Sequence, residues 1–147
     1  MSKATDADPV DLAARALRHR DRSRRQLDDR LAKAGVDEEA RADALETLER
    51  VGYVDDTRFA AARADSLAGR GFGDEAIREL LAGDGVGPEA VEAALAGLES
   101  EADRARALAE RLGRTPKAAA QLQRKGFGPD AVEAAFGSLF AEGDAGA

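Results

Sequence analysis

The chain has 147 residues, with 22 Lys and Arg against 29 Asp and Glu, for a formal net charge of −7. It contains no Cys and a single His, which excludes disulfides and thiolate metal sites and argues against a His-based metal site or catalytic triad. No apolar run approaches membrane-spanning length and no signal-peptide pattern follows Met1, so we expect a cytoplasmic protein with no membrane contact and no cofactor.

The apolar residues are mostly small and only 4% of the chain is aromatic, a composition that favours closely packed helices over one thick core. A helical period begins at Pro9 and breaks before Ser23, which is suited to cap the start of a second helix. Gly35 is predicted to end that helix in a left-handed conformation. A third helix is predicted from near Asp37 to Gly52.

This three-helix pattern occurs three times. The motif Gly35-Val36-x-x-x-Ala40 recurs 50 residues later, and again 91 residues later with Phe in place of Val. Leu27 matches Ile77, but the third copy has Ala118 there. Other positions that agree at these offsets are Leu17, Leu67 and Leu108; Arg20, Arg70 and Arg111; Leu31, Leu81 and Leu122; Ala44, Ala94 and Ala135; Leu45, Leu95 and Phe136; and Leu48, Leu98 and Leu139.

The repeats predict an all-α fold without a sheet, because no segment alternates as a strand does. Each copy is too short to bury much surface alone, so three should stack into an elongated, curved array. We predict three tandem three-helix, helix-turn-helix-like repeats at residues 9–54, 55–98 and 99–141. Residues 1–8 and 142–147 are predicted to be disordered ends.

The stretch from Val51 to Ala60 should join the first two copies. Gly52 closes one helix, and the pair Asp55 and Asp56 is better suited to cap the next helix than to bind metal or to catalyse. Tyr53 and Phe59 flank these caps, and we expect them to form a hydrophobic clamp that fixes the angle between the copies. The predicted structural joint therefore comprises Gly52, Tyr53, Asp56 and Phe59. No nucleophile has a base beside it, so we expect no enzyme activity.

Charge is distributed unevenly along the chain. Residues 12–34 carry a net charge of +5 and residues 100–126 a net charge of +4, whereas residues 56–84 carry −2. The third helix of every copy is acidic. Contacts with an anionic partner are therefore expected from the basic first and second helices, although a solvated face is an equally good interpretation of the Arg cluster. The candidate binding residues are Arg15, Arg18, Arg20, Arg22, Arg24, Arg25, Arg58, Arg70, Arg111, Arg114 and Lys117.

The segment Gly69-Arg70-Gly71-Phe72-Gly73 is rich in glycine but lacks the preceding strand and the following Lys-Ser/Thr of a phosphate-binding loop. We interpret it as a loop between two helices. Phe72 is expected to pack on its own repeat, and Arg70 to contact a partner.

Two other functions remain open. The pattern around Gly35 is typical of a helix-turn-helix, so the chain could be a DNA-binding transcriptional regulator. Acidic residues such as Glu38 and Glu39 follow that turn, and their charge would oppose entry of the helix into a DNA groove. The other alternative is a generic helical adaptor that contacts no nucleic acid.

Three motifs together resemble a known family. They are Arg22-Ser23-x-x-x-Leu27-x-x-x-Leu31, Leu48-x-x-x-Gly52-Tyr53-Val54-x-Asp56-x-x-Phe59-Ala60, and Gly71-x-Gly73-x-x-x-Ile77-x-x-x-Leu81-x-x-x-Gly85-Val86. In this order they resemble the RecX regulatory proteins, and the resemblance runs from about Val10 to Leu139.

The resemblance implies a bacterial cytoplasmic modulator of the RecA recombinase in DNA repair, recombination and the SOS response. Such a protein binds RecA and its nucleoprotein filament and inhibits ATP hydrolysis and strand exchange, with weak nucleic-acid contact as a further partner. The family provides no catalytic residues, and the matched Arg22, Ser23, Asp56 and Phe59 are fold positions that could also make contacts. We expect a monomer. The acidic total charge and Ala118 depart from the family pattern and argue against tight independent DNA binding.

Overall fold

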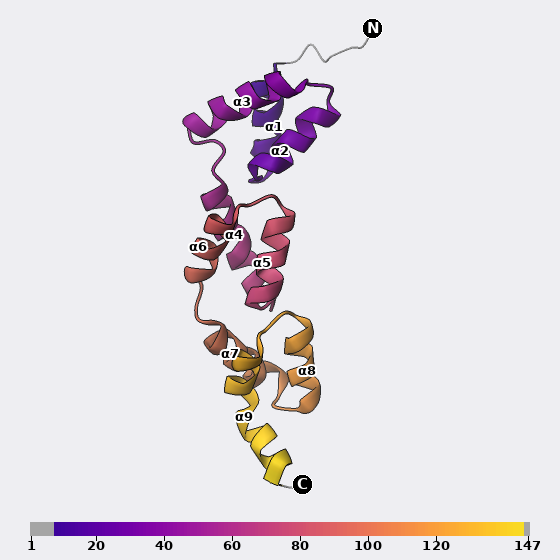
Figure 1. The fold of residues 1–147 in the computed structure, drawn as a ribbon, viewed down its shortest axis with the longest axis vertical. Helices are drawn as coiled ribbons and strands as arrows, with labels where there is room; N and C mark the ends of the chain where they lie inside the picture. Colours follow the sequence, from indigo (N-terminus) through magenta and orange to yellow (C-terminus); the bar gives the residue numbers. More distant parts are fainter. Residues whose placement is uncertain (1–7, 146–147) are drawn as a thin grey trace.

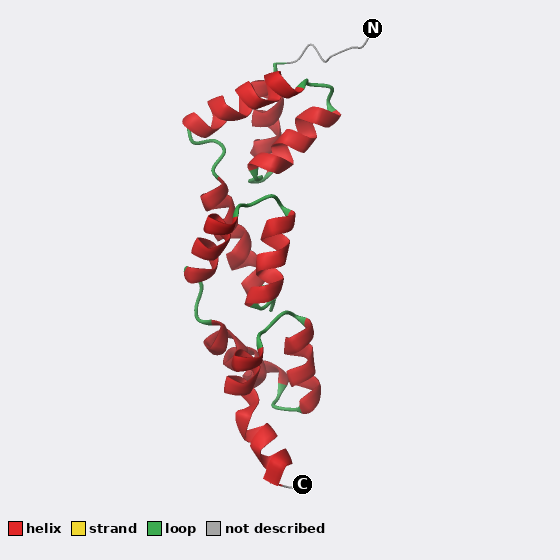
Figure 2. Ribbon diagram, viewed as in Figure 1, coloured by secondary structure: helices red, strands yellow, loops and turns green. Residues whose placement is uncertain are grey.

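The computed structural model describes residues 8–145, with side chains as far as Gly137. Over this range the chain is helical, without strands, which confirms the predicted all-α class. Figure 2 shows helices joined only by loops and turns. The helices of the described range are α1 (Pro9–His19), α2 (Arg24–Lys33), α3 (Glu38–Arg50), α4 (Asp56–Gly69), α5 (Asp74–Gly83), α6 (Pro88–Ala96), α7 (Glu101–Leu112), α8 (Pro116–Arg124) and α9 (Pro129–Ala145).

Local sequence explains where the helices begin. Ser23 caps α2 as predicted: its hydroxyl accepts from the N–H of Gln26, and the Gln26 side chain accepts from the N–H of Ser23, which completes a capping box. Asp55 caps α4 in the predicted way, by accepting from the N–H of Arg58. Pro116 is the first residue of α8, where its fixed φ suits the first turn and its missing N–H costs no bond within the helix.

The turn that follows the second helix of each group explains the repeated Gly-apolar motif. Gly35 has a φ of 89°, the left-handed conformation predicted for it. The N–H of the next residue, Val36, donates to the carbonyl oxygen of Leu31 at 3.1 Å, and its side chain is buried. Val86 and Phe127 follow a left-handed Gly in the same way and are also buried. The turn thus returns an apolar side chain to the core.

The helices form three groups, α1–α3, α4–α6 and α7–α9, and each group encloses its own apolar cluster. Leu27, Leu31 and Leu45 belong to the first cluster, and Ile77 and Leu81 to the second. The third contains Ala105, Ala109, Ala118, Ala119, Leu122, Phe127, Ala131, Val132, Ala135 and Phe136. Small side chains are enough to fill each cluster, because the helices pack closely around a thin core.

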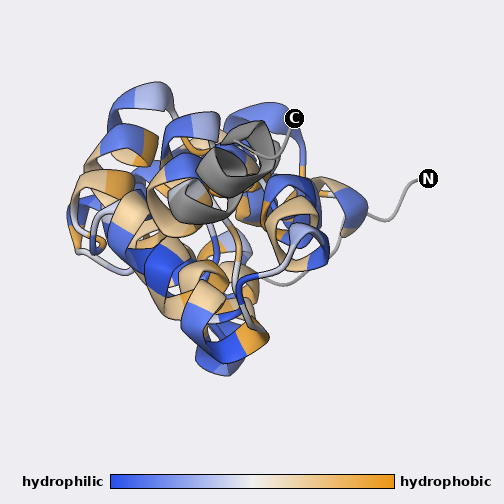
Figure 3. Ribbon diagram, turned by 90° about the horizontal axis from the view of Figure 1, so that it is seen from below, coloured by the Kyte–Doolittle hydropathy of each residue, from blue (hydrophilic) through white to orange (hydrophobic). Residues whose placement is uncertain are grey.

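The three groups follow one another along an elongated column, with the two ends of the chain at opposite ends (Figure 1). Seen along the column, each helix alternates hydrophilic and hydrophobic stretches, as expected when one side of a helix packs on its own repeat (Figure 3). No helix within residues 8–145 combines the length and the apolar composition needed to cross a membrane.

The helical part of the chain extends closer to the C-terminus than predicted. Helix α9 extends to Ala145, so residues 142–145 are helical where a disordered tail was predicted. The physical reason is that Ala141 and Glu142 have high helix propensity and no Pro follows to stop the helix. Residues 1–7 and 146–147, which were also predicted to be disordered, and the side chain of Leu139 lie outside the described part.

The first joint brings the start of α2 against the turn between α5 and α6. The hydroxyl of Ser23 donates to the carbonyl oxygen of Asp84 at 2.6 Å. The N–H of Arg24 donates to Oδ1 of Asp56 at 2.8 Å. Asp56 was predicted to cap a helix, and it does so for α2 of the preceding group. This joint is held by side chains that reach across to the backbone.

The second joint repeats this arrangement between α5 and the last group. The N–H of Gly73 donates to the carbonyl oxygen of Lys125 at 2.8 Å, and the N–H of Asp74 donates to Oε2 of Glu101 at 2.7 Å. Glu101 is the first residue of α7, as Asp56 is of α4. Its other oxygen accepts from the N–H of Gly128 at 3.4 Å. An acid at the start of the next group therefore closes both joints.

An ion pair adds to the second joint. Nη2 of Arg104 lies 2.9 Å from Oδ1 of Asp74 without hydrogen-bond alignment, and it also donates to the carbonyl oxygen of Phe72. The Arg104 side chain is only 9% exposed, and its guanidinium lies over the ring of Phe127. Arg104 therefore belongs to the structure of the joint.

The predicted clamp of Tyr53 and Phe59 is wrong. Phe59 is buried, but in the core of the second group, whereas Tyr53 is 61% exposed. The reason lies in the turn: Gly52 takes a φ of 84°, and the residue that returns to the core of the first group is Val54, one position further along. The orientation of the two groups depends instead on Asp56 and Ser23.

Candidate partner-binding surface

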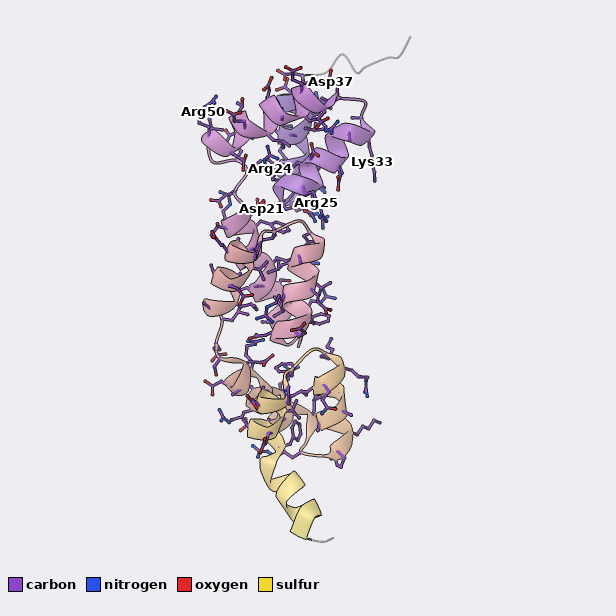
Figure 4. The ribbon with its side chains drawn as sticks, in the orientation of Figure 1. Asp21, Arg24, Arg25, Lys33, Asp37 and Arg50 are labelled. Atoms are coloured by element: carbon purple, nitrogen blue, oxygen red, sulfur yellow. The ribbon has the colours of Figure 1, made fainter. Side chains whose placement is uncertain are left out.

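Four of the predicted binding residues already make contacts within the protein. Arg25 donates to the carbonyl oxygen of Gly83 across the first joint. Arg24 pairs with Glu49, with Nε and Oε1 2.9 Å apart. Figure 4 shows Arg25 and Asp21 at the end of the first group that faces the second. Arg25 therefore helps to hold the first two groups together, whereas the Arg24 side chain pairs within the first group.

The other two have local partners. Nε of Arg22 donates to the carbonyl oxygen of Ala16 at 3.3 Å. Arg58 donates to the carbonyl oxygens of Gly52 and Tyr53, and its Nε lies 3.5 Å from Oδ2 of Asp21. Arg58 therefore fixes the turn that follows α3.

Positive charge accumulates on the surface of α2. Burial, followed by the positive charges of Arg30 and Arg20, lowers the pKa of Arg22 from its ordinary value. This mutual repulsion marks a place where an anion would be favoured. A surface depression of about 240 Å³ runs there, lined by Arg20, Arg22, Gln26, Asp29, Arg30 and Lys33.

A second hollow, of about 420 Å³, lies between α1 and α2. Its floor is apolar, with Leu12, Leu27 and Leu31, and its lining carries no acidic residue. We define the basic face of the first repeat as the Arg, Lys and His side chains that line these two hollows. They are Arg15, His19, Arg20, Arg22, Arg30 and Lys33.

Arg30 and Lys33 were not among the residues singled out in the sequence. Both contribute to the net charge of residues 12–34, but a denser run of arginines lies before them in the sequence. Arg30 and Lys33 are three residues apart on the predicted second helix, which would have placed them near one another. They make no salt bridge with any described residue.

The remaining candidates lie elsewhere on the column. Arg70 is exposed and lies with Lys125 against the ring of Phe72, which packs on the second core as predicted. Arg111, Arg114 and Lys117 are exposed around the connection from α7 to α8, away from the first group (Figure 1). The structure thus separates a first basic surface from a second one by a middle group whose net charge is negative.

The described residues contain no group of three or more His, Cys, Asp or Glu side chains placed to hold a metal ion. The Asp55 and Asp56 carboxylates are both occupied by backbone N–H groups of Arg58 and Arg24. The candidate site on the described residues is a positively charged surface.

Similarity to known proteins adds an independent comparison. No family model matches the chain. The chain is 40% identical over 70 residues to the regulatory protein RecX of Xanthomonas axonopodis pv. citri, covering 48% of this chain and 43% of that protein. It is 37% identical over 73 residues to the regulatory protein RecX of Acidithiobacillus ferrooxidans, covering 50% and 49%. These matches span less than half the length of the curated relatives.

Solved structures share the fold over a longer stretch. The crystal structure of RecX from Lactobacillus salivarius superposes with a TM-score of 0.77 and 19% identity, covering 90% of this chain and 95% of that one. A second crystal structure of a regulatory protein RecX gives a TM-score of 0.73 at 22% identity, with 85% and 69% covered. The sequence relatives are regulatory proteins named RecX, and the chain shares its helical-repeat fold with crystal structures of RecX.

Proposed function

We propose that this protein binds the RecA recombinase and its nucleoprotein filament and inhibits ATP hydrolysis and strand exchange during DNA repair and recombination. The similarity to regulatory proteins named RecX supports this function. The observation that carries the proposal at the level of residues is the basic face of the first repeat, whose cations Arg30 and Lys33 have no acidic partner among the described side chains.

The column is suited to a long polymer rather than to a compact ligand. Basic surfaces on its first and last groups are separated by the acidic middle group, so a partner with repeated anionic sites can engage both. Two weak contacts held on one rigid body give a stronger combined affinity than either alone. Because the contacts are electrostatic, binding should weaken steeply as salt concentration rises.

A role as a DNA-reading transcriptional regulator has less support. Helix α3 follows the turn at Gly35 and begins with Asp37 as its cap and Glu38 and Glu39 in its first turn. These carboxylates would face phosphates if the helix entered a groove. Protection of a defined duplex sequence would be needed to favour this alternative.

The test is the single-strand-dependent ATPase of the cognate RecA, titrated with this protein. We expect inhibition by the wild type, and at least a tenfold higher inhibitory concentration for the double variant Arg30→Glu/Lys33→Glu, because charge reversal removes two contacts to an anionic partner. The matched control is Arg78→Glu/Arg106→Glu, which reverses one half-buried and one exposed cation outside the basic face and should inhibit as the wild type does.

Absence of inhibition by the wild type at any ratio would refute the proposal. Equal inhibition by both double variants would instead indicate an adaptor whose partner does not use the basic face. Circular dichroism of each variant must match the wild type, so that loss of fold is not mistaken for loss of binding.

A further inference from the structure

Tyr53 breaks a pattern that the other turns follow. Its N–H donates to the carbonyl oxygen of Leu48 at 2.9 Å, in the bond that Val36, Val86 and Phe127 make at their own turns. Those three side chains are buried, whereas the Tyr53 side chain is 61% exposed. Val54, one position further along, fills the core of the first group instead, so the Tyr53 ring is left on the surface, where a ligand can reach it.

The ring stands at the edge of a surface hollow. The hollow has a volume of about 540 Å³ and lies between α1 and the start of α4. Its lining combines an aromatic ring, aliphatic side chains and guanidinium groups. The lining residues are Ala14, Leu17, Arg18, Asp21, Gly52, Tyr53 and Arg58.

The backbone under the ring is fixed from both sides. Besides the bond to Leu48, the carbonyl oxygen of Tyr53 accepts from Nη2 of Arg58 at 3.2 Å. Arg58 also donates to the carbonyl oxygen of Gly52 at 3.0 Å. A ring mounted on such a turn loses little conformational entropy when a ligand stacks on it, because the backbone is already ordered.

The charges in the hollow favour an anion beside the ring. The one carboxylate of the lining, Asp21, pairs with Arg58 at 3.5 Å. Arg18 makes no salt bridge with any described residue. The hollow therefore offers one exposed aromatic face and one guanidinium that has no acidic partner.

We propose that Tyr53 is a stacking platform for a base of single-stranded nucleic acid, with Arg18 contacting a neighbouring phosphate. An aromatic face beside a cation is the pair of groups by which proteins hold single strands without regard to sequence. A duplex is not expected to bind in this way, because its bases stack on one another and their faces are not available to the Tyr53 ring. This inference is separate from RecA binding, because the ligand is the free strand.

The chain carries its own probe for this site. Tyr53 is the only Tyr and there is no Trp, so the intrinsic tyrosine emission of the protein comes from this ring alone. Titration with an oligothymidylate at low salt should quench that emission, and added salt should restore it. Unchanged emission at saturating oligothymidylate would overturn the proposal, even if the strand binds elsewhere on the protein.

Variants separate stacking from charge, measured by the fluorescence anisotropy of a labelled oligothymidylate. Tyr53→Ala should weaken binding by about five- to a hundredfold, the range that one base–aromatic stack contributes, while Tyr53→Phe retains most of the affinity. Arg18→Gln should weaken binding and reduce its salt dependence. Leu112→Ala, which truncates another exposed apolar side chain, is the matched control and should bind as the wild type does.

The same variants distinguish this site from the proposed function. If Tyr53→Ala loses oligothymidylate binding and still inhibits RecA, the stacking site stands and filament binding uses other contacts. If Tyr53→Ala keeps oligothymidylate binding and loses RecA inhibition, Tyr53 contacts a protein and the stacking proposal fails. Each protein should melt within a few degrees of the wild type, because the ring is exposed.

Discussion

The two joints of the column are built on the same plan and differ in how closely the backbones approach. In both, the first N–H of a second helix donates to an acid at the start of the next repeat: Arg24 to Asp56, and Asp74 to Glu101. At the first joint a Ser23 hydroxyl spans the remaining gap to a carbonyl oxygen. At the second, Gly73 brings its own N–H to the matching carbonyl oxygen. The residue at the helix cap, Ser23 or Gly73, therefore sets the distance between the two backbones at each joint.

The joints also differ in charge. The first positions of α2 hold Arg24 and Arg25, and the matching positions of α5 hold Asp74 and Glu75. The Arg25 side chain of the basic cluster thus holds the first joint, together with the backbone N–H of Arg24. At the second joint the acid of α5 requires a cation from α7, which is Arg104. Basic residues near a repeat boundary are accordingly poor guides to a binding surface.

The largest expected effect comes from closing the space at the second joint. A Cβ at residue 73 would lie 2.4 Å from the backbone nitrogen of Phe127, so Gly73→Ala must push the last repeat away. We expect a loss of about 2–3 kcal/mol in the free energy of unfolding, the usual cost of overpacking. Chemical denaturation measures it. Gly69→Ala is the control, since a Cβ there meets nothing within 4 Å, and it should not destabilise. Equal stability of the two variants would mean that the joint is not rigid.

A smaller effect should distinguish the two acids. Glu101 accepts from two N–H groups and Asp56 from one across the joint. We expect Glu101→Ala to cost about 2 kcal/mol and Asp56→Ala about 1 kcal/mol, because each removes charge-assisted bonds from half-buried donors. Amide hydrogen exchange at Asp74 and Arg24 would localise each loss. Glu89→Ala, at an exposed position in the first turn of α6, controls for the helix dipole. The reverse order of the two losses would contradict the comparison.

The smallest effect concerns an ion pair within a repeat, away from both joints. The hydrogen bond from Arg78 holds the pKa of Glu92 below its ordinary value. Because the pKa is depressed, the pair stabilises the fold above the ordinary pKa, and this contribution is lost as pH falls through the lowered value. Arg78→Gln should raise the pKa of Glu92 toward normal in an NMR titration and leave the unfolding midpoint unchanged. A large fall in the midpoint would show that surface pairs contribute as much as the joints.

Most of the fold could be predicted from the sequence because its signals are local. The cap at Ser23 and the left-handed Gly35 depend on residues within a few positions, and the internal repetition supplied the number of units. The extent of α9 was underestimated because nothing local marks its end. The partner of Asp56 lies 32 residues away, at Arg24. A sequence pattern indicates that an Asp caps a helix, but the identity of that helix depends on how repeats stack.

The candidate surface was less predictable, because it too depends on contacts between residues that are far apart in the sequence. The sequence shows how many cations a helix carries, yet whether a guanidinium is free depends on what packs nearby. Arg25 donates to the carbonyl oxygen of Gly83 in a distant segment, and Arg58 donates to those of the nearby turn, while Arg30 and Lys33 line open surface. Tyr53 was expected to form a hydrophobic clamp with Phe59, because the two residues flank the predicted caps. Only the position of Val54 in the core reveals that this turn is shifted by one residue.

Pro116 prevents the hydrogen bond of the two joints from being repeated after the third repeat. In the first two repeats the first residue of the second helix, Arg24 or Asp74, donates its N–H to the acid of the next repeat. Pro116, the first residue of α8, has no N–H to donate. A further copy of residues 55–98 placed after the third repeat could not be joined by the bond that holds the others. Anyone who wishes to lengthen this protein by concatenating repeats must first replace Pro116 with a residue such as Asp, which restores the missing donor.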